Sequence, residues 1–171
     1  MVLLFFGSFN PFHKGHLTVA RTALAKYFDS KVWFVLSVQN PFKDESDLLA
    51  YYKRYDMLQR MLIYEPNMIV CDIEKKLPKP SYTINTLNAI TSEYPDEEFL
   101  LLMGQDNLEE ITMWKDYKKI LKRFPIVVYP REGGRTRSSE NAPALPKYAK
   151  ITFLEGPLLD YSSTKIRNFA R

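Results

Sequence analysis

Residues 2–16 read VLLFFGSFNPFHKGH, and the fold prediction starts from this stretch. It opens with five apolar residues, which are typical of a strand buried on both faces. A glycine, Gly7, then allows the chain to turn tightly. His13 and His16 follow at a spacing that places both imidazoles on one side of a helix beginning near Lys14. The stretch therefore predicts a strand, a tight turn and a helix, the first unit of a parallel α/β sheet.

The same alternation continues along the chain. Further apolar runs predict strands, and between them apolar residues recur at three- and four-residue steps, the period of a helix with one buried face. In the first helix this face comprises Leu17, Ala20, Leu24 and Phe28. Strands alternating with helices form right-handed crossovers, so we expect a three-layer α/β sandwich with a mostly parallel sheet. The expected strands are 2–6, 32–37, 68–71, 99–103, 126–129 and 151–154, and the other expected helices are 49–63, 82–94 and 117–121.

Length and composition exclude several classes of protein. The 171 residues, 46% of them hydrophobic, suffice for one domain with its own core. No apolar run approaches the roughly 20 residues that span a bilayer, and the N-terminus lacks the features of a signal peptide. The single cysteine, Cys71, fits a buried thiol in a reducing compartment. We therefore expect a cytoplasmic protein that is independent of membranes.

The charge of the chain suits an anionic ligand. Its formal net charge is +4, and its positive residues are scattered. No run of like charges marks a nucleic-acid arm, so no nucleic-acid partner is expected. The sequence carries no signature of a particular oligomeric state. Residues 130–146 hold glycines and arginines, and we expect one long loop that could close on a ligand.

The only two histidines of the chain lie together directly after the first predicted strand. Ligands of open α/β sheets bind at the carboxyl ends of the strands, and a helix N-terminus attracts phosphate. Imidazoles there can donate hydrogen bonds to phosphate oxygens as charge builds in a transition state. We therefore favour His13 and His16 as catalytic residues over two surface histidines. A zinc site is the other alternative, and it lacks thiol or carboxylate ligands at suitable spacing.

A second motif, YSSTKIR, occupies residues 161–167. Its three hydroxyl residues, Ser162, Ser163 and Thr164, precede a helical pattern and could simply cap that helix. The functional alternative is a second helix N-terminus, at which these hydroxyls and Arg167 hold phosphates, with Arg167 as a third catalytic residue beside the two histidines.

The two motifs together resemble the H-x-G-H and S-S-T-x-I-R signatures of the nucleotidyltransferase superfamily, with Tyr161 where isoleucine is more usual. The resemblance implies a Rossmann-like fold and attack on the α-phosphate of a nucleoside triphosphate, with release of pyrophosphate. It also implies help from Mg²⁺, held by the phosphates and not by protein side chains. Ile166 and Arg167 are usually followed in the family by another short helix, which a chain ending at Arg171 would lack.

Further segments are similar to the nicotinate (or nicotinamide) mononucleotide adenylyltransferase family of NAD biosynthesis. They are QNPFK at 39–43, SYTINTL at 81–87 and GQDNL at 104–108, followed by Trp114 and Arg131. The resemblance runs in order from Val2 to Arg167. One departure is that many members carry a histidine before the lysine that corresponds to Lys43.

The chemistry of these positions agrees with the roles that the resemblance implies. Lys43 can reach a polyphosphate, and Asp106 can accept from ribose hydroxyls or cap the next helix. Trp114 offers a flat face to a pyridine ring or belongs to the core, to which we assign Trp33. Thr83 could bind the acceptor or cap a helix. The implied ATP site is Gly7, Ser8, Phe9, His13, His16, Lys43, Gly104, Asp106, Ser162, Ser163, Thr164 and Arg167; the implied acceptor site is Asn10, Lys43, Tyr82, Thr83, Trp114 and Arg131.

The resulting hypothesis is transfer of AMP from Mg²⁺-ATP to nicotinate mononucleotide, giving deamido-NAD and pyrophosphate. Because no nucleophile with an adjacent base is evident, we expect direct in-line attack aided by positioning and charge stabilisation. No side chain separates nicotinate from nicotinamide mononucleotide as acceptor. The alternatives are adenylyl transfer to phosphopantetheine, cytidylyl transfer to a polyol phosphate, and a nucleotide sensor without turnover. An RNA-binding module is disfavoured because no basic stripe with interleaved aromatics is present.

Overall fold

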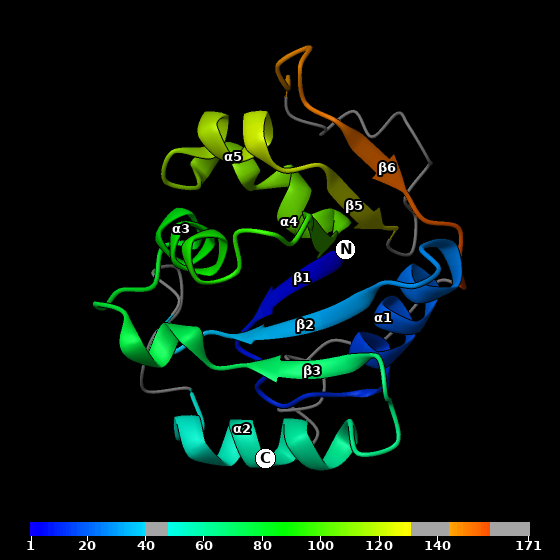
Figure 1. Ribbon diagram of the computed structural model, residues 1–171, viewed down its shortest axis with the longest axis vertical. Coiled ribbons are helices and arrows are strands. Elements are labelled where there is room, and N and C mark those ends of the chain that lie inside the picture. Colours follow the sequence, from blue (N-terminus) through cyan, green and yellow to red (C-terminus); the bar gives the residue numbers. More distant parts are fainter. Residues whose placement is uncertain (40–47, 131–143, 158–171) are drawn as a thin grey trace.

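Six parallel strands form one sheet in the order β3-β2-β1-β4-β5-β6 (Figure 1). The computed structural model describes residues 1–39, 48–130 and 144–157. Each of the six predicted strands is confirmed to within one residue at either end. The mostly parallel sheet is confirmed as well, and over the described residues it is wholly parallel. The strands are β1 (Val2–Gly7), β2 (Lys31–Leu36), β3 (Met68–Cys71), β4 (Phe99–Gly104), β5 (Ile126–Tyr129) and β6 (Ile151–Phe153).

Helices cover both faces of the sheet and bury a separate core on each. Side chains alternate along a strand, so neighbouring residues such as Leu3 and Leu4 of β1 enter different cores. One core lies under α1 and α2, and the other under α3, α4 and α5. The predicted three-layer sandwich is therefore confirmed. The helices are α1 (Lys14–Lys26), α2 (Tyr51–Met61), α3 (Thr83–Glu93), α4 (Gln105–Glu109) and α5 (Tyr117–Arg123), with 3-10 turns η2 (Ile73–Lys76) and η3 (Ile111–Met113).

One predicted helix face is wrong in its last member. The buried residues of α1 are Gly15, Val19, Ala20 and Ala23, whereas Phe28 is 81% exposed. The helix ends at Lys26, so Phe28 no longer follows the helical period that would have turned it toward the sheet. Short elements such as α4, η2 and η3 were not predicted, since they span too few residues to show a period.

The strand order places a switch point between β1 and β4. From β1 the chain moves outward through β2 to β3, and it then returns to pair β4 with the other side of β1. Crossovers therefore diverge on either side of these two strands, and ligands of such sheets bind at the carboxyl ends of the strands at this point. Within the described ranges, no helix combines the length and apolar character needed to cross a bilayer.

A matched pair of phenylalanine variants tests the two-sided core. Phe34 of β2 is 0% exposed, and Phe28 after α1 is 81% exposed. We expect Phe34→Ala to lower the free energy of unfolding by about 3–5 kcal/mol, because it opens a cavity in the core. Phe28→Ala should change it by no more than about 0.5 kcal/mol. Chemical denaturation measures both values, and similar losses in the two variants would contradict the assignment of Phe28 to the surface.

Candidate active site

The loop after β1 has a shape that only glycine at its start permits. A Cβ atom on Gly7 would lie 2.9 Å from two ring atoms of Phe9. Phe9 itself has a φ of 44°, in the left-handed region, and its side chain is 2% exposed. Its ring packs edge-on against Phe5 and Phe34, so the loop folds back over the end of the strand. Any contact of Phe9 with a nucleotide would therefore come from its backbone.

The two histidines form a reciprocal cap at the N-terminus of α1. The helix begins at Lys14, as predicted, with His13 as its N-cap. Nδ1 of His13 accepts from the N–H of Gly15 at 3.2 Å, and the N–H of His13 donates to Nδ1 of His16, also at 3.2 Å. A ring nitrogen that accepts carries no proton, so the neutral imidazoles hold their proton on Nε2. Both rings thereby become Nε2–H donors at a helix N-terminus.

Aromatic neighbours fix the orientation of the His16 ring. It stacks on Phe12 with a centroid distance of 5.3 Å and meets the edge of Phe9 at 5.1 Å. The ring of His13 lies 3.8 Å from it, centroid to centroid. The two imidazoles are therefore held side by side before any ligand arrives, which is the preorganisation that charge stabilisation requires.

The end of β4 lies beside the histidine loop. Phe5 pairs with Leu102, so Gly7 and Gly104 occupy equivalent positions two residues further along neighbouring strands. Gly104 is the N-cap of α4, and a Cβ atom on it would lie 2.6 Å from Oδ1 of Asp106. Asp106 belongs to the first turn of α4, so the alternative that Asp106 caps this helix is wrong. The glycines therefore occupy neighbouring positions at the carboxyl ends of β1 and β4, and the segments that carry the histidines and Asp106 start from this edge of the sheet.

Three of the residues predicted to bind the acceptor, Tyr82, Thr83 and Trp114, lie at or near the start of α3. Tyr82 is the N-cap of α3 without a side-chain cap hydrogen bond, so Thr83 is not the cap. Nζ of Lys115 lies 4.5 Å from the centroid of the Tyr82 ring, which places the residue after Trp114 against the start of α3. Trp114 is half-buried, and Tyr82 and Trp114 pack against the same core.

Asn10 and Ser8 are buried in the loop after β1, with 3% and 7% exposure. Oδ1 of Asn10 accepts from the N–H of Leu49 at 3.1 Å, so this side chain ties the loop to the segment before α2.

Trp33 is confirmed as a core residue, 8% exposed and in ring contact with Phe99. The other predicted residues lie outside the described ones: Lys43, Arg131, Tyr161, Ser162, Ser163, Thr164 and Arg167.

A buried arginine beneath the site was not predicted. Arg54 of α2 is 1% exposed, and its Nη1 donates to the carbonyl oxygens of Ser8 and Ser37, both at 2.8 Å. Its Nε donates to the carbonyl of Leu49 at 2.8 Å. Burial lowers the pKa of this guanidinium, and the neighbouring Tyr51 and Glu74 oppose that change. One sequence signal existed: Arg54 lies four residues before the buried Leu58 and therefore on the apolar face of the helix.

A buried glutamate was also missed. Glu74 of η2 is 2% exposed, and burial raises the pKa of its carboxyl group. In sequence it belongs to the charged run DIEKK at 72–76, which is typical of a solvated loop. No local pattern distinguishes Glu74 from its charged neighbours, because its burial depends on packing against β2 and α3.

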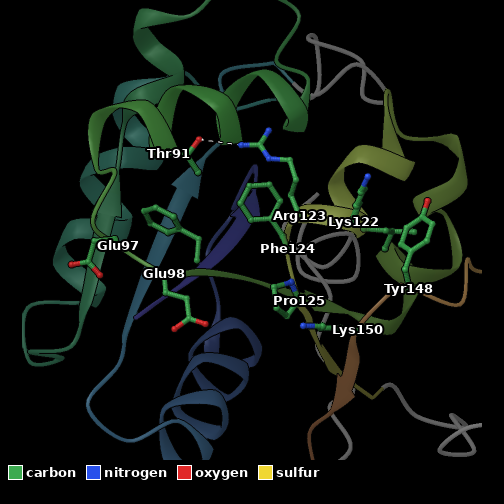
Figure 2. A pocket seen from close by; sticks show the side chains of 11 residues that line it. Thr91, Glu97, Glu98, Lys122, Arg123, Phe124, Pro125, Tyr148 and Lys150 are labelled. Atoms are coloured by element: carbon green, nitrogen blue, oxygen red, sulfur yellow. Dashed lines mark hydrogen bonds between the residues drawn. The ribbon is translucent and has the colours of Figure 1, made fainter.

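A groove of about 450 Å³ lies at the opposite edge of the sheet, where β4, β5 and β6 begin (Figure 2). Figure 2 shows Glu97 and Glu98 on one side of it and Lys122 and Lys150 on the other. Arg123 donates to Thr91 at 3.4 Å. Since strand carboxyl ends form the ligand edge of such sheets, this mixed-charge groove is separate from the candidate site.

The described part of the site offers imidazole and backbone donors and no metal cluster. Among residues 1–39, 48–130 and 144–157, no group of three or more histidine, cysteine, aspartate or glutamate side chains could hold a metal ion. A cation carried by nucleotide phosphates needs no such cluster, because the phosphate oxygens supply its ligands.

Comparison with known proteins agrees with this geometry. Residues 4–169 match the family model described as cytidylyltransferase-like. The probable nicotinate-nucleotide adenylyltransferase of Cytophaga hutchinsonii is 41% identical over 98% of this chain and 84% of its own length. The corresponding protein of Flavobacterium johnsoniae is 39% identical over 96% of this chain and 83% of its own length.

Solved structures share the fold. The nicotinic acid mononucleotide adenylyltransferase of Plasmodium falciparum, complexed with NaAD, has a TM-score of 0.77 and 19% identity, over 98% of this chain and 82% of that one. A putative nicotinate-nucleotide adenylyltransferase of Vibrio parahaemolyticus has a TM-score of 0.68 and 20% identity, over 98% and 84%. At these identities the structures show a common architecture. By its family model and its relatives, the chain belongs to the nicotinate-nucleotide adenylyltransferase family.

Proposed function

We propose that this protein transfers the adenylyl group of ATP to nicotinate mononucleotide, forming deamido-NAD and releasing pyrophosphate. The observation that carries the proposal is the pair of Nε2–H imidazole donors at the N-terminus of α1, beside the switch point of the sheet. Family membership supports the same reaction. We further propose that residues 1–171 form a single nucleotidyltransferase domain that works in the cytoplasm.

The reaction needs positioning and charge stabilisation more than covalent chemistry. An oxygen of the acceptor phosphate forms a bond to the α-phosphorus of ATP, and the bond from that phosphorus to the bridging oxygen breaks. Pyrophosphate leaves with the electron pair, so negative charge grows on phosphate oxygens. His13 and His16 donate hydrogen bonds to those oxygens, and the N-terminus of α1 adds its dipole. Magnesium enters as part of the Mg²⁺-ATP substrate.

Residues on either side of the histidines complete the nucleotide site in this proposal. Asp106 accepts from the ribose hydroxyls, and the loop after β1 receives the phosphates with its backbone. On the acceptor side, the start of α3 at Tyr82 and Thr83 receives the carboxylate of the pyridine ring, and Trp114 packs on that ring. Asn10 contacts the acceptor in this proposal, while its Oδ1 accepts from the N–H of Leu49. The assignments that rest on the resemblance alone are Lys43, Arg131, Ser162, Ser163, Thr164 and Arg167.

His16→Ala should lower kcat about a hundredfold or more, because it removes one preorganised donor to the transition state. Steady-state pyrophosphate release measures the effect, and thermal unfolding checks that the variant keeps its fold. Thr18→Ala serves as the control, since Thr18 lies on the same helix and its hydroxyl donates to the carbonyl of Lys14. Turnover of His16→Ala within a few-fold of wild type would remove His16 from the mechanism.

Gly104→Ala should raise the KM for ATP about tenfold, the cost of one hydrogen bond to a charged group. The new Cβ atom would lie 2.6 Å from Oδ1 of Asp106 and would push that carboxylate away from the ribose. Asp106→Ala should raise the KM by a similar factor, and the double variant should be no worse than Asp106→Ala alone. An unchanged KM in Asp106→Ala would show that this carboxylate does not bind ATP.

The proposed function is tested directly by pyrophosphate release from Mg²⁺-ATP. Nicotinate mononucleotide, nicotinamide mononucleotide and phosphopantetheine are supplied as separate acceptors, and CTP replaces ATP in a parallel series. We expect release with ATP and nicotinate mononucleotide, at a higher kcat/KM than with the amide. Release only with phosphopantetheine, or only with CTP, would overturn the acceptor or the nucleotide assignment. ATP binding without release from any acceptor would favour a sensor.

A further inference from the structure

The carboxylate of Glu74 lies among hydrogen-bond donors from two other segments of the chain. Its Oε2 accepts from the N–H of Val38 at 3.1 Å, and its Oε1 accepts from the hydroxyl of Thr86 at 2.9 Å. The side chains of Ser37 and Ser81 also favour the charged form of this carboxyl group and oppose the rise in its pKa. Glu74 and Thr86 are 2% and 0% exposed, so these bonds are shielded from water.

These donors come from the two segments that flank the proposed acceptor site. Ser37 and Val38 follow β2, whereas Ser81 and Thr86 bracket the start of α3. A direct backbone bond joins the same segments, since the N–H of Ser81 donates to the carbonyl of Gln39 at 3.0 Å. Glu74 itself follows β3, so one carboxylate links three stretches of chain at the carboxyl edge of the sheet.

Arg54 donates hydrogen bonds to the carbonyl oxygens of the same turn after β2. Its Nη1 donates to the carbonyl of Ser37 at 2.8 Å, and its Nη2 donates to the carbonyl of Val38 at 3.4 Å. The N–H of Val38 points instead to Glu74. The turn after β2 is therefore fixed from both sides, by a buried cation on its carbonyls and a buried carboxylate on its N–H.

Stability alone is a poor reason for this arrangement. Desolvation penalises the charged carboxyl group and raises its pKa, while the hydrogen bonds from its neighbours oppose the rise. Apolar side chains of similar volume can often replace buried charges at no loss of stability. A carboxylate that accepts several directional hydrogen bonds instead specifies where those backbone segments lie.

We propose that Glu74 is a positioning residue for the acceptor: by tying the turn after β2 to the start of α3, it sets the geometry of the pyridine-binding backbone at Tyr82 and Thr83. Glu74 does not touch substrate in this role. The inference rests on the proposed function, because it assigns these segments to the mononucleotide acceptor and leaves the histidine site unaffected.

The test compares Glu74→Ala, Glu74→Gln and Thr86→Val in steady-state kinetics with both substrates varied. Glu74→Ala should raise the KM for nicotinate mononucleotide about tenfold or more, since it leaves buried donors without a partner. Glu74→Gln should recover part of this loss, because its amide oxygen can still accept from Val38. Thr86→Val removes the hydrogen bond to Glu74, together with the longer one to the carbonyl of Tyr82 at 3.4 Å, at nearly constant volume. It should raise this KM about two- to tenfold. The KM for ATP should stay within about twofold in all three.

Glu65→Ala is the matched control, since Glu65 pairs with Arg21 before β3, at the opposite edge of the sheet. It should leave both KM values unchanged. Hydrogen exchange supplies a readout that is independent of activity: the amide of Val38 should lose protection in Glu74→Ala and keep most of it in Glu74→Gln. If Glu74→Ala fails to fold, Thr86→Val and Glu74→Gln carry the comparison.

The possible outcomes separate this proposal from the proposed function. Faster exchange at Val38 with a selective rise in the acceptor KM supports the positioning role. Equal rises in both KM values, or a lowered melting temperature with neither KM changed, would assign Glu74 to general stability and overturn it. A wild-type enzyme that transfers no adenylyl group to a pyridine mononucleotide would overturn the proposed function, and with it the acceptor role, whatever the exchange rates of the variants.

Discussion

The apolar side chains of β1 must be buried on both faces of the sheet at once, and most of the architecture follows from this constraint. Leu3 and Phe5 enter the core under α1 and α2, while Val2 and Leu4 enter the core under α3, α4 and α5. Helices on both faces require the crossovers to run in two directions from the centre of the sheet. The carboxyl ends of β1 and β4 therefore lie at the switch point, where ligands of such sheets bind.

The candidate site at this edge needs few side chains, because backbone groups and a helix cap supply or orient many of its hydrogen-bond donors. Gly7 and Gly104 let the chain turn directly at the strand ends, where a Cβ atom would meet Phe9 or Asp106. The reciprocal cap of His13 and His16 satisfies donors at the N-terminus of α1 and also sets the tautomer of both rings. The interactions that start the helix are thus the same ones that prepare the proposed donors for phosphate.

Two buried charged side chains fix the loops at this edge of the sheet from the interior of the protein. Arg54 joins the loop after β1 to the turn after β2, and Glu74 joins that turn to the start of α3. These directional bonds fix the loop after β1, on the proposed nucleotide side, relative to the start of α3, on the proposed acceptor side, before substrates bind. Such rigidity favours in-line transfer, in which small errors of placement are costly.

The sequence alone predicted the strands and the longer helices, and it pointed to the two histidines as candidate catalytic residues. Continuous apolar runs located the six strands of the sheet, because this signal is local. The spacing of His13 and His16 after a strand and a glycine is equally local, and it predicts a phosphate site. Packing between distant segments sets the strand order, the exposure of Phe28 and the burial of Arg54 and Glu74. Those features depend on which distant segments meet. A glutamate in a charged run reads as solvated until packing against β2 and α3 removes it from water, and no local pattern encodes that contact.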